Sequence, residues 1–292
     1  MSEVLIQKIE KEDIKVPNLE NGDSAIVFQR HERYERDRDA ENAGSLIPEH
    51  AEAASERDVA FFEELFGNED TETMVLFTSS DTQYASGGYR SLETAQIAQD
   101  AAIKVLEEMG IEPSSRIINL NPHFATNGFK STKQTIRPDK KIREPQIFDT
   151  PEYVDYLRDK YGKEDGSGTG ISPKAWAMHE MDAEKEAREQ MGAEGVHEML
   201  DRTKKSIAIM NRYAKMFHAN NPDKALLIWT ASHYDTISPM VKDATDVSFE
   251  EYVPVDYGAG VVIELHSDED PTLHAQGQKA KLGLAATAIK HP

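Results

Sequence analysis

The chain has 292 residues and a formal net charge of −20, from 53 acidic and 33 basic side chains. It is long enough to bury a substantial core, and 38% hydrophobic with 29% charged residues is typical of a globular protein rather than a disordered or fibrous one. No apolar run approaches the roughly 18 residues that a membrane span needs. The absence of cysteine excludes disulfides, thiolate catalysis and zinc-thiolate or iron-sulfur sites.

The charge and the first residues indicate possible partners and location. We expect no nucleic acid partner, because phosphate backbones are bound by basic surfaces. A small anion can still bind where a few arginines converge, since salt screens remote charges within about 8 Å. The first twenty residues lack the uninterrupted apolar centre of a secretory signal, so we expect a cytoplasmic protein with no membrane partner. The sequence does not indicate an oligomeric state.

Strand and helix patterns alternate along much of the chain. Apolar residues recur at three- and four-residue spacing over 90–109, before Gly110, and over 200–217, before Pro222, which predicts a helix in each segment. Five short β-rich runs predict strands at 25–28, 74–77, 117–120, 225–229 and 260–265. Together they predict a three-layer α/β sandwich, a mostly parallel sheet with helices on both faces.

The segment 121–197 differs from the rest, because it is rich in proline, contains a flexible glycine and serine run and has no strong strand pattern. We therefore expect one domain over 1–292, with a core at about 22–120 and 198–265 and an inserted cap between. A basic patch in this cap is either a solvated loop or a substrate-facing lid. Its cations are Lys130, Lys133, Arg137, Lys140, Lys141 and Arg143. Beyond Leu265 we expect a peripheral helix or partial disorder.

Candidate site residues follow three of the predicted strands, where ligands of open α/β sheets bind. The first strand leads into Arg30 and His31, an anion clamp beside a nucleophile or base. The second leads to Ser80 and then to Arg90, at the head of a helix whose free N–H groups favour anions. The fourth leads to His233. Two histidines and two arginines are thus expected at one edge of the sheet.

The order of these motifs resembles the histidine phosphatase superfamily, which includes the cofactor-dependent phosphoglycerate mutases. The matching motifs are Arg-His after a strand, Ser-Ser, then Arg-x-x-x-Thr-Ala at the start of a helix, and Thr-x-x-His after a later strand. The segment 44–49, Gly-Ser-Leu-Ile-Pro-Glu, is similar to the family's Leu-Thr-Pro-x-Gly. The resemblance covers about 24–110 and 198–265, and its strength lies in the order of the motifs.

The resemblance implies a role for each matching residue. His31 would be the nucleophile that forms a phosphohistidine, Arg30 and Arg90 would hold phosphate oxygens, and His233 would stabilise the transferred group. Ser80 is a candidate for binding the phosphate through its hydroxyl. Such a site needs no metal and no cofactor, because two guanidiniums and a second imidazole supply the positive charge that phosphoryl transfer requires.

A leaving alkoxide must be protonated, and two carboxylic acids are candidates for this step. Glu144 follows Arg143 in a segment similar to the Leu-Arg-Glu or Leu-x-Glu of the mutase-like branch, and it is the favoured donor. Asp235 lies two residues after His233, and it resembles the His-Asp pair of the acid phosphatase branch with Tyr234 in between. The structural alternative for Glu144 is a loop acid paired with Arg143.

The sequence departs from the family pattern beside the nucleophile. Glu32 stands where the family has glycine, which places a carboxylate next to His31. Arg33 either pairs with Glu32 or points into the pocket as a third clamp for substrate. The loop between Ser80 and Arg90 is also longer than usual for the family. The other histidines lack metal-ligand spacing and are expected at the surface: His50, His123, His179, His197, His218, His266, His274 and His291.

The expected activity is metal-independent hydrolysis of a small phosphomonoester through a phosphohistidine on His31. One alternative is a mutase acting on a small phosphorylated carboxylic acid, with the basic segment 130–143 binding the carboxylate. The other is an inactive family member that binds a phosphorylated ligand or a protein partner, which the Glu32 substitution motivates. The sequence does not indicate which phosphorylated substrate is used.

Overall fold

The computed structural model describes residues 8–37, 40–83, 88–120, 136–163 and 171–284. Its strands are β1 (Ser24–Arg30), β2 (Glu72–Ser80), β3 (Arg137–Asp139), β4 (Lys224–Ser232), β5 (Gly260–Leu265), β6 (Thr272–Ala275) and β7 (Gln278–Lys281). Its α-helices are α1 (Pro48–Phe66), α2 (Arg90–Glu108), α3 (Pro151–Tyr161), α4 (Pro173–Glu180), α5 (Lys185–Met191), α6 (Val196–Asn220) and α7 (Tyr234–Thr245). Short 3₁₀ helices are η1 (Lys11–Asp13), η2 (Pro113–Ser115), η3 (Ile118–Leu120), η4 (Lys140–Ile142) and η5 (Gln146–Asp149).

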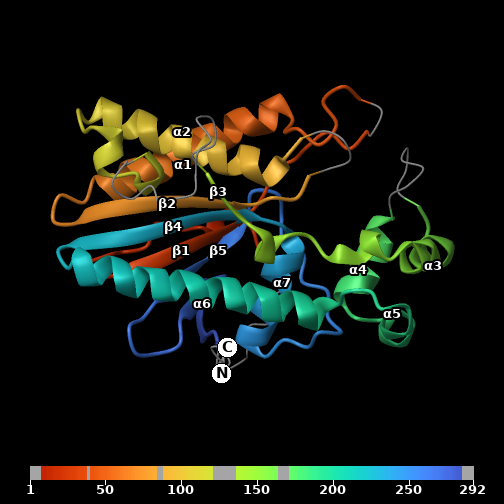
Figure 1. Ribbon diagram of the computed structural model, residues 1–292. Helices are drawn as coiled ribbons and strands as arrows, with labels where there is room; N and C mark the ends of the chain where they lie inside the picture. Colours follow the sequence, from red (N-terminus) through yellow and green to blue (C-terminus); the bar gives the residue numbers. More distant parts are fainter. Residues whose placement is uncertain (1–7, 38–39, 84–87, 121–135, 164–170, 285–292) are drawn as a thin grey trace.

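A single sheet, with the strand order β3-β2-β4-β1-β5-β6-β7 over the described residues, forms the middle layer (Figure 1). Strands β3, β2, β4 and β1 run parallel, and β5, β6 and β7 continue the sheet with antiparallel pairing. Arg30 pairs with Ser232 in the register of β1 and β4. The parallel strands β1, β2 and β4 therefore end at the same edge of the sheet.

Helices cover both faces of the sheet, α1 and α2 on one and α6 and α7 on the other (Figure 1). Side chains alternate between the two faces along each strand. Val27 and Trp229 pack with Phe62 of α1, while Ile26 packs with Ile207 of α6 in a second core. The three-layer sandwich predicted from the sequence is confirmed, as are its two long helices. Among the described residues, no helix is both long and apolar enough to cross a bilayer.

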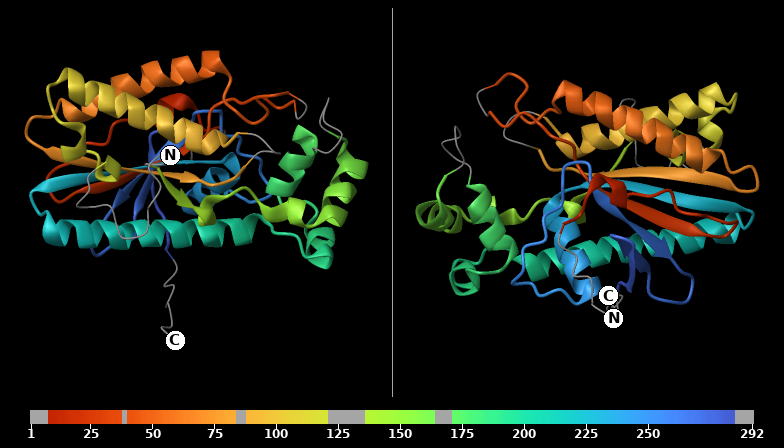
Figure 2. Two further views of the ribbon diagram at one scale, coloured as in Figure 1. Left: turned by 45° about the horizontal axis from the view of Figure 1, so that its top comes forward. Right: turned by 180° about the vertical axis from the view of Figure 1, so that it is seen from behind.

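The helices α3, α4 and α5 form a lobe beside the sheet end where β2 and β4 finish (Figures 1 and 2). Ser172 starts α4 by accepting a hydrogen bond on its hydroxyl from the backbone N–H of Ala175, at 3.1 Å. The lobe has a small core of its own, which includes Ile147, Tyr153, Val154, Leu157, Ile171 and Ala175. A separate core of this kind is typical of a cap attached to a larger domain.

We expected no strand in the cap, and this expectation is wrong at one place. Residues 137–139 form β3, which pairs in parallel with 78–80 of β2 at the edge of the sheet. Pro138 hid this strand in the sequence, because proline lacks an N–H group and is tolerated only on edge strands. Residues 121–135, which include Lys130 and Lys133, and residues 164–170 lie outside the described part.

Two further segments differ from the prediction. The expected strand at 117–120 is the 3₁₀ turn η3, because the side-chain amide of Asn119 bonds both the N–H and the carbonyl of Phe77 in place of a strand ladder. The described part of the region after Leu265, residues 266–284, is not a helix but contains the hairpin of β6 and β7, seen from behind in Figure 2. Gln276 and Gly277, both with positive φ, form its two-residue turn.

Candidate active site

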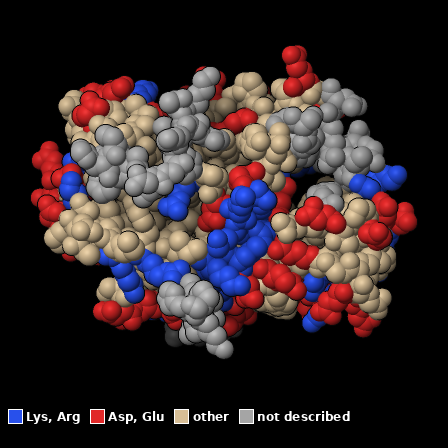
Figure 3. All heavy atoms as spheres, viewed as in Figure 1, with Lys and Arg blue, Asp and Glu red and all other residues tan. Residues whose placement is uncertain are grey.

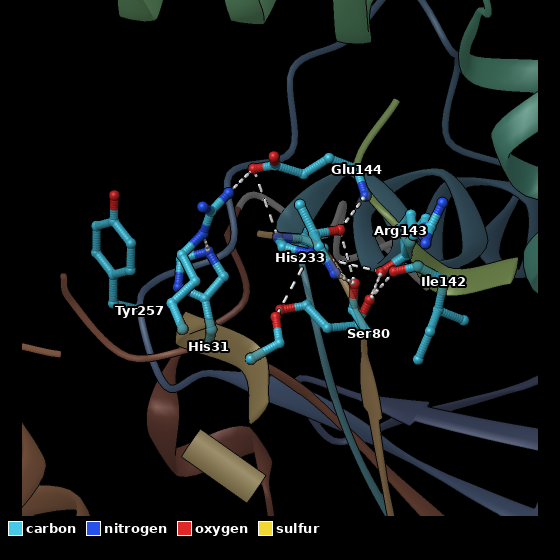
Figure 4. Close-up of polar contacts among 12 residues, drawn as sticks. His31, Ser80, Ile142, Arg143, Glu144, His233 and Tyr257 are labelled. Carbon is cyan, nitrogen blue, oxygen red and sulfur yellow. Dashed lines mark hydrogen bonds and ion pairs between the residues drawn. The ribbon is translucent and has the colours of Figure 1, made fainter. Parts of the chain in front are cut away.

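The carboxyl ends of β1, β2 and β4 bring together residues from distant parts of the chain (Figure 4). His31 follows β1, Ser80 ends β2 and His233 follows β4. The two histidines are almost fully buried, and their ring centroids lie 5.2 Å apart in an edge-to-face arrangement. The structure therefore assembles both predicted histidines in one buried site.

His31 is oriented by its own neighbour in the chain. Its Nδ1 lies 2.7 Å from the carbonyl oxygen of Glu32, so the N–H group is assigned to Nδ1 and the lone pair to Nε2. The Nε atom of Arg90 donates to Nε2 at 3.0 Å. Burial, and then the charge of Arg90, hold the pKa of His31 well below its ordinary value. His31 is therefore neutral, the form that acts as a nucleophile.

Arg90 connects the nucleophile to Glu144. It is the first residue of α2, its guanidinium is buried over the ring of Tyr34 at 4.4 Å, and its Nη2 forms an ion pair with Oε1 of Glu144 (Figure 4). The same Oε1 lies 3.5 Å from Nδ1 of His233. Arg143 pairs instead with Asp81, so the pairing of Glu144 with Arg143 that we considered is not found. Glu144 belongs to the site.

His233 and Ser80 form the opposite wall. Nε2 of His233 lies 3.0 Å from the hydroxyl of Ser80, which also contacts the hydroxyl of Thr82 at 2.8 Å. Burial, followed by the charges of Arg90 and Arg30, lowers the pKa of His233 well below its ordinary value. Both imidazoles are neutral, so the positive charge of the site comes from its arginines.

Arg30 contributes charge from the side of the site formed by β1. Its guanidinium lies over the ring of Tyr257 at 3.7 Å and donates to the carbonyl of Val255. It is close enough to lower the pKa of both His31 and His233. The charges of both predicted clamps, Arg30 and Arg90, thus act on the nucleophile.

Glu32, which stands where the family motif has glycine, is buried and pairs with basic residues of α1 and the N-terminal segment. Its Oε1 accepts a hydrogen bond from Arg57 of α1 at 2.7 Å, and Lys11 lies 3.6 Å from Oε2. A Cβ atom at Gly258 would lie 2.0 Å from Oε1, so only glycine fits beside this carboxylate. Arg33 is exposed, and its guanidinium lies near the ring of Tyr257. The cations that pair with Glu32 are Arg57 and Lys11 rather than Arg33.

Arg202 of α6 was not indicated by any sequence motif. It donates to the carbonyl oxygens of Arg143 and Glu144 at 2.8 and 2.9 Å, and its Nε pairs with Glu194 at 2.7 Å. Arg202 therefore holds the backbone of the segment that carries Glu144. Arg57 and Tyr257 were also missed, since each acts on a residue distant in sequence.

Asp235, the other predicted proton donor, lies in the first turn of α7 and is buried. Burial raises its pKa to about 7, and Tyr234 and Arg30 are the nearest groups that oppose this shift. Glu180, which forms a buried ion pair with Lys242, raises the pKa of Asp235 further through its negative charge. The groups that act on Asp235 are thus Tyr234, Arg30 and Glu180, whereas Glu144 contacts Arg90 and lies near His233.

The raised pKa of Asp235 predicts a pH dependence of stability. Between about pH 4 and pH 7 the folded protein holds a proton that the unfolded chain releases, so this stabilisation is lost as pH rises. Asp235→Asn should therefore gain stability relative to wild type from pH 4 to pH 8, by roughly 2–4 kcal/mol. Urea unfolding at about pH 4 and pH 8 measures the free energy of unfolding of the variant relative to wild type, with Glu250→Gln, at an exposed position, as control. A relative stability that is the same at both pH values would contradict the prediction.

The expectation that the remaining histidines lie at the surface is wrong for His179. It is buried against Tyr153 in the cap, and burial lowers its pKa to about 4. His123 and His291 lie outside the described residues. In the described ranges, no group of three or more histidines and carboxylates is arranged to hold a metal ion.

Comparison with known proteins gives structural likenesses at low sequence identity. No protein-family model matches the chain, and no curated protein matches it. A phosphoglycerate mutase from Bacillus anthracis str. Sterne is 17% identical with a TM-score of 0.48, over 92% of this chain and 96% of that one. A mycobacterial glucosyl-3-phosphoglycerate phosphatase is 14% identical with a TM-score of 0.38, over 82% and 92%.

A multiple inositol polyphosphate phosphatase from Bifidobacterium longum is 10% identical with a TM-score of 0.44, over 94% of this chain and 91% of that one. The histidine phosphatase superfamily stays a prediction from the order of motifs in the sequence. The structure places the motif residues Arg30, His31, Ser80, Arg90 and His233 close together.

Proposed function

We propose that the protein hydrolyses small phosphomonoesters through a phosphohistidine on His31, without a metal. The observation that carries this proposal is the buried, neutral His31, whose Nε2 faces Arg90 while Glu144 bridges Arg90 and His233. A phosphate between the two histidines would meet two guanidiniums, and charge stabilisation of the equatorial oxygens is what phosphoryl transfer requires.

In the first step, Nε2 of His31 attacks phosphorus and the bond between phosphorus and the ester oxygen breaks. Nδ1 keeps its proton and donates a hydrogen bond to the carbonyl oxygen of Glu32 throughout. The entering phosphate would displace the Glu144 carboxylate from Arg90, and an anion beside a carboxylate favours its protonation. Glu144 then gives this proton to the departing alkoxide.

In the second step, water attacks the phosphohistidine while the Glu144 carboxylate takes one of its protons. The bond between nitrogen and phosphorus breaks, inorganic phosphate leaves and Nε2 recovers its lone pair. The cycle consumes one water and returns His31 and Glu144 to their starting forms. His233 and Ser80, which are hydrogen-bonded to each other, would hold the transferred group during both steps.

Turnover of an aryl phosphate in excess chelator tests the proposal. We expect wild type to release inorganic phosphate, and His31→Ala to lose at least about 10³-fold in kcat and to form no phosphoenzyme detectable by intact mass. The matched control is His197→Ala, at an exposed position of α6. Activity retained in His31→Ala, or lost with the chelator, would contradict the proposal.

The products separate the alternatives. Isomerised ester in place of free phosphate would indicate a mutase. Phosphate binding without turnover by wild type would indicate an inactive binding protein. The buried Glu32 carboxylate is paired with Arg57, and this pairing supports activity over inactivity.

A further inference from the structure

A cavity of about 630 Å³ opens beside the candidate proton donor. Its lining includes Glu144 and Ser80, which both belong to the active site. An ester oxygen protonated by Glu144 must lie next to this carboxyl group, so the organic part of the substrate has this cavity beside it. The residues that line this cavity therefore indicate which chemical class of leaving group the site can accept.

The cavity wall is suited to hydroxyl groups. The uncharged polar residues of the lining have hydroxyl or amide side chains, groups that can both donate and accept hydrogen bonds: Ser79, Ser80, Thr82, Gln83, Tyr89 and Gln146. Its apolar residues are Leu92, Ile136, Pro138 and Pro145. A mixture of hydroxyls and small apolar surfaces is typical of pockets for polar, uncharged ligands.

The charges of the lining oppose an acidic leaving group. Arg143 is the one cation among the described residues of the lining, and both Nε and Nη2 of its guanidinium bond the carboxylate of Asp81, the latter at 2.6 Å. Glu144 and Asp149 add two further carboxylates. Two-point binding of this kind occupies the Nε–Nη2 edge of Arg143, one of the two edges through which a guanidinium binds a carboxylate, and it neutralises the charge of Arg143.

The other described cations of the basic segment lie elsewhere. Arg137 and Lys140 are exposed, and the lysines and arginines over β3, η4 and α6 gather in a band on the outer surface (Figure 3). The residues that line the cavity do not include Arg137, Lys140 or Lys141. The lid with a carboxylate site considered from the sequence therefore finds no support in the described part of that segment.

We infer that the substrate is a phosphate ester of an uncharged, hydroxyl-rich alcohol, a sugar or polyol phosphate, and that the Asp81–Arg143 ion pair discriminates against acidic leaving groups. This inference rests on the proposed function, and it names the substrate class for the same site. A carboxylate in the cavity would meet three acidic side chains and a cation that is already paired.

Two matched pairs of esters test this inference. Glycerol 3-phosphate and 3-phosphoglycerate differ in having a hydroxymethyl or a carboxylate group, as do glucitol 6-phosphate and 6-phosphogluconate. We expect kcat/KM to be at least about tenfold higher for the member of each pair that has the hydroxymethyl group in place of the carboxylate. In Asp81→Asn, which releases Arg143, we expect this preference to fall by about tenfold or more. Asp155→Asn, which removes an exposed partner of Arg158 in the cap, is the control and should leave the ratio unchanged.

Aryl phosphate turnover in the same preparations reports on the proposed function separately. If aryl phosphate is turned over but the acidic ester is used equally well or better, the substrate class is wrong while the proposed function stands. If there is no turnover, calorimetry of the same esters with wild type decides. Tighter binding of the ester without the carboxylate supports the inference. Equal binding of the two esters, tighter binding of the ester with the carboxylate, or no binding of either overturns it.

Discussion

Glu144→Gln should slow phosphorylation of the enzyme by an alkyl phosphate by about 10²–10⁴-fold, the usual contribution of a general acid. Glutamine preserves the shape of the side chain but cannot donate a proton to the departing alkoxide. A nitrophenyl phosphate needs no such proton, because nitrophenolate is a stable leaving group. We therefore expect a rapid burst of nitrophenolate close to that of wild type, followed by slow turnover because the base for the second step is also lost.

Quench-flow measurement of the burst and single-turnover hydrolysis of the alkyl ester give the two rates. Asp235→Asn is the informative control, because Asp235 is the other candidate donor and its carboxyl group interacts with Tyr234 and Arg30. If Asp235→Asn, rather than Glu144→Gln, selectively slowed the alkyl ester, then Asp235 would be the proton donor. A loss of the nitrophenolate burst in Glu144→Gln would show that Glu144 acts in binding or in folding instead.

Arg57→Ala should destabilise the protein by about 3–5 kcal/mol, the usual cost of leaving one member of a buried ion pair without its partner. The carboxylate of Glu32 is fully buried, and Arg57 bonds it at 2.7 Å. Arg57 also bonds the buried carboxylate of Asp58 at 2.8 Å, so its removal affects two acids together. Equilibrium unfolding in urea measures the loss.

A double variant separates the ion pair from the packing of Arg57. In the background of Arg57→Ala, Glu32→Gln removes the uncompensated charge and keeps the side-chain volume. We expect the double variant to be more stable than Arg57→Ala alone, a non-additivity typical of residues in direct contact. Simple addition of the two single effects would mean that Glu32 and Arg57 are not coupled.

The sequence predicted those parts of the molecule that depend on local patterns. The run 225–229 is β-rich and the apolar spacing of 200–217 is helical, and both elements formed where expected. Because parallel strands end at one edge, His31 and His233 could be placed together from the strand pattern alone. At 117–120 the local pattern was misleading, since a single amide, that of Asn119, replaces the strand ladder.

Contacts between residues distant in sequence could not be predicted in this way. Arg57 lies in a helix with ordinary amphipathic spacing, and nothing near it indicates that Glu32 is its partner. Arg202 acts on a segment about sixty residues earlier in the chain. Even the departure at Glu32 was interpreted too locally, because the carboxylate is held by residues of α1 and the N-terminal segment rather than by its neighbour Arg33.

Arg202 binds the segment 141–144, which carries Glu144, in a way that does not depend on the side chains of that segment. Arg202 donates to three carbonyl oxygens, those of Lys141, Arg143 and Glu144, which every amino acid possesses. The anchor thus depends on the path of the backbone and not on the identity of the residues it binds. Position 143, whose side chain faces the cavity, can therefore be exchanged during evolution to suit another substrate while the carboxyl group at 144 stays where the chemistry needs it.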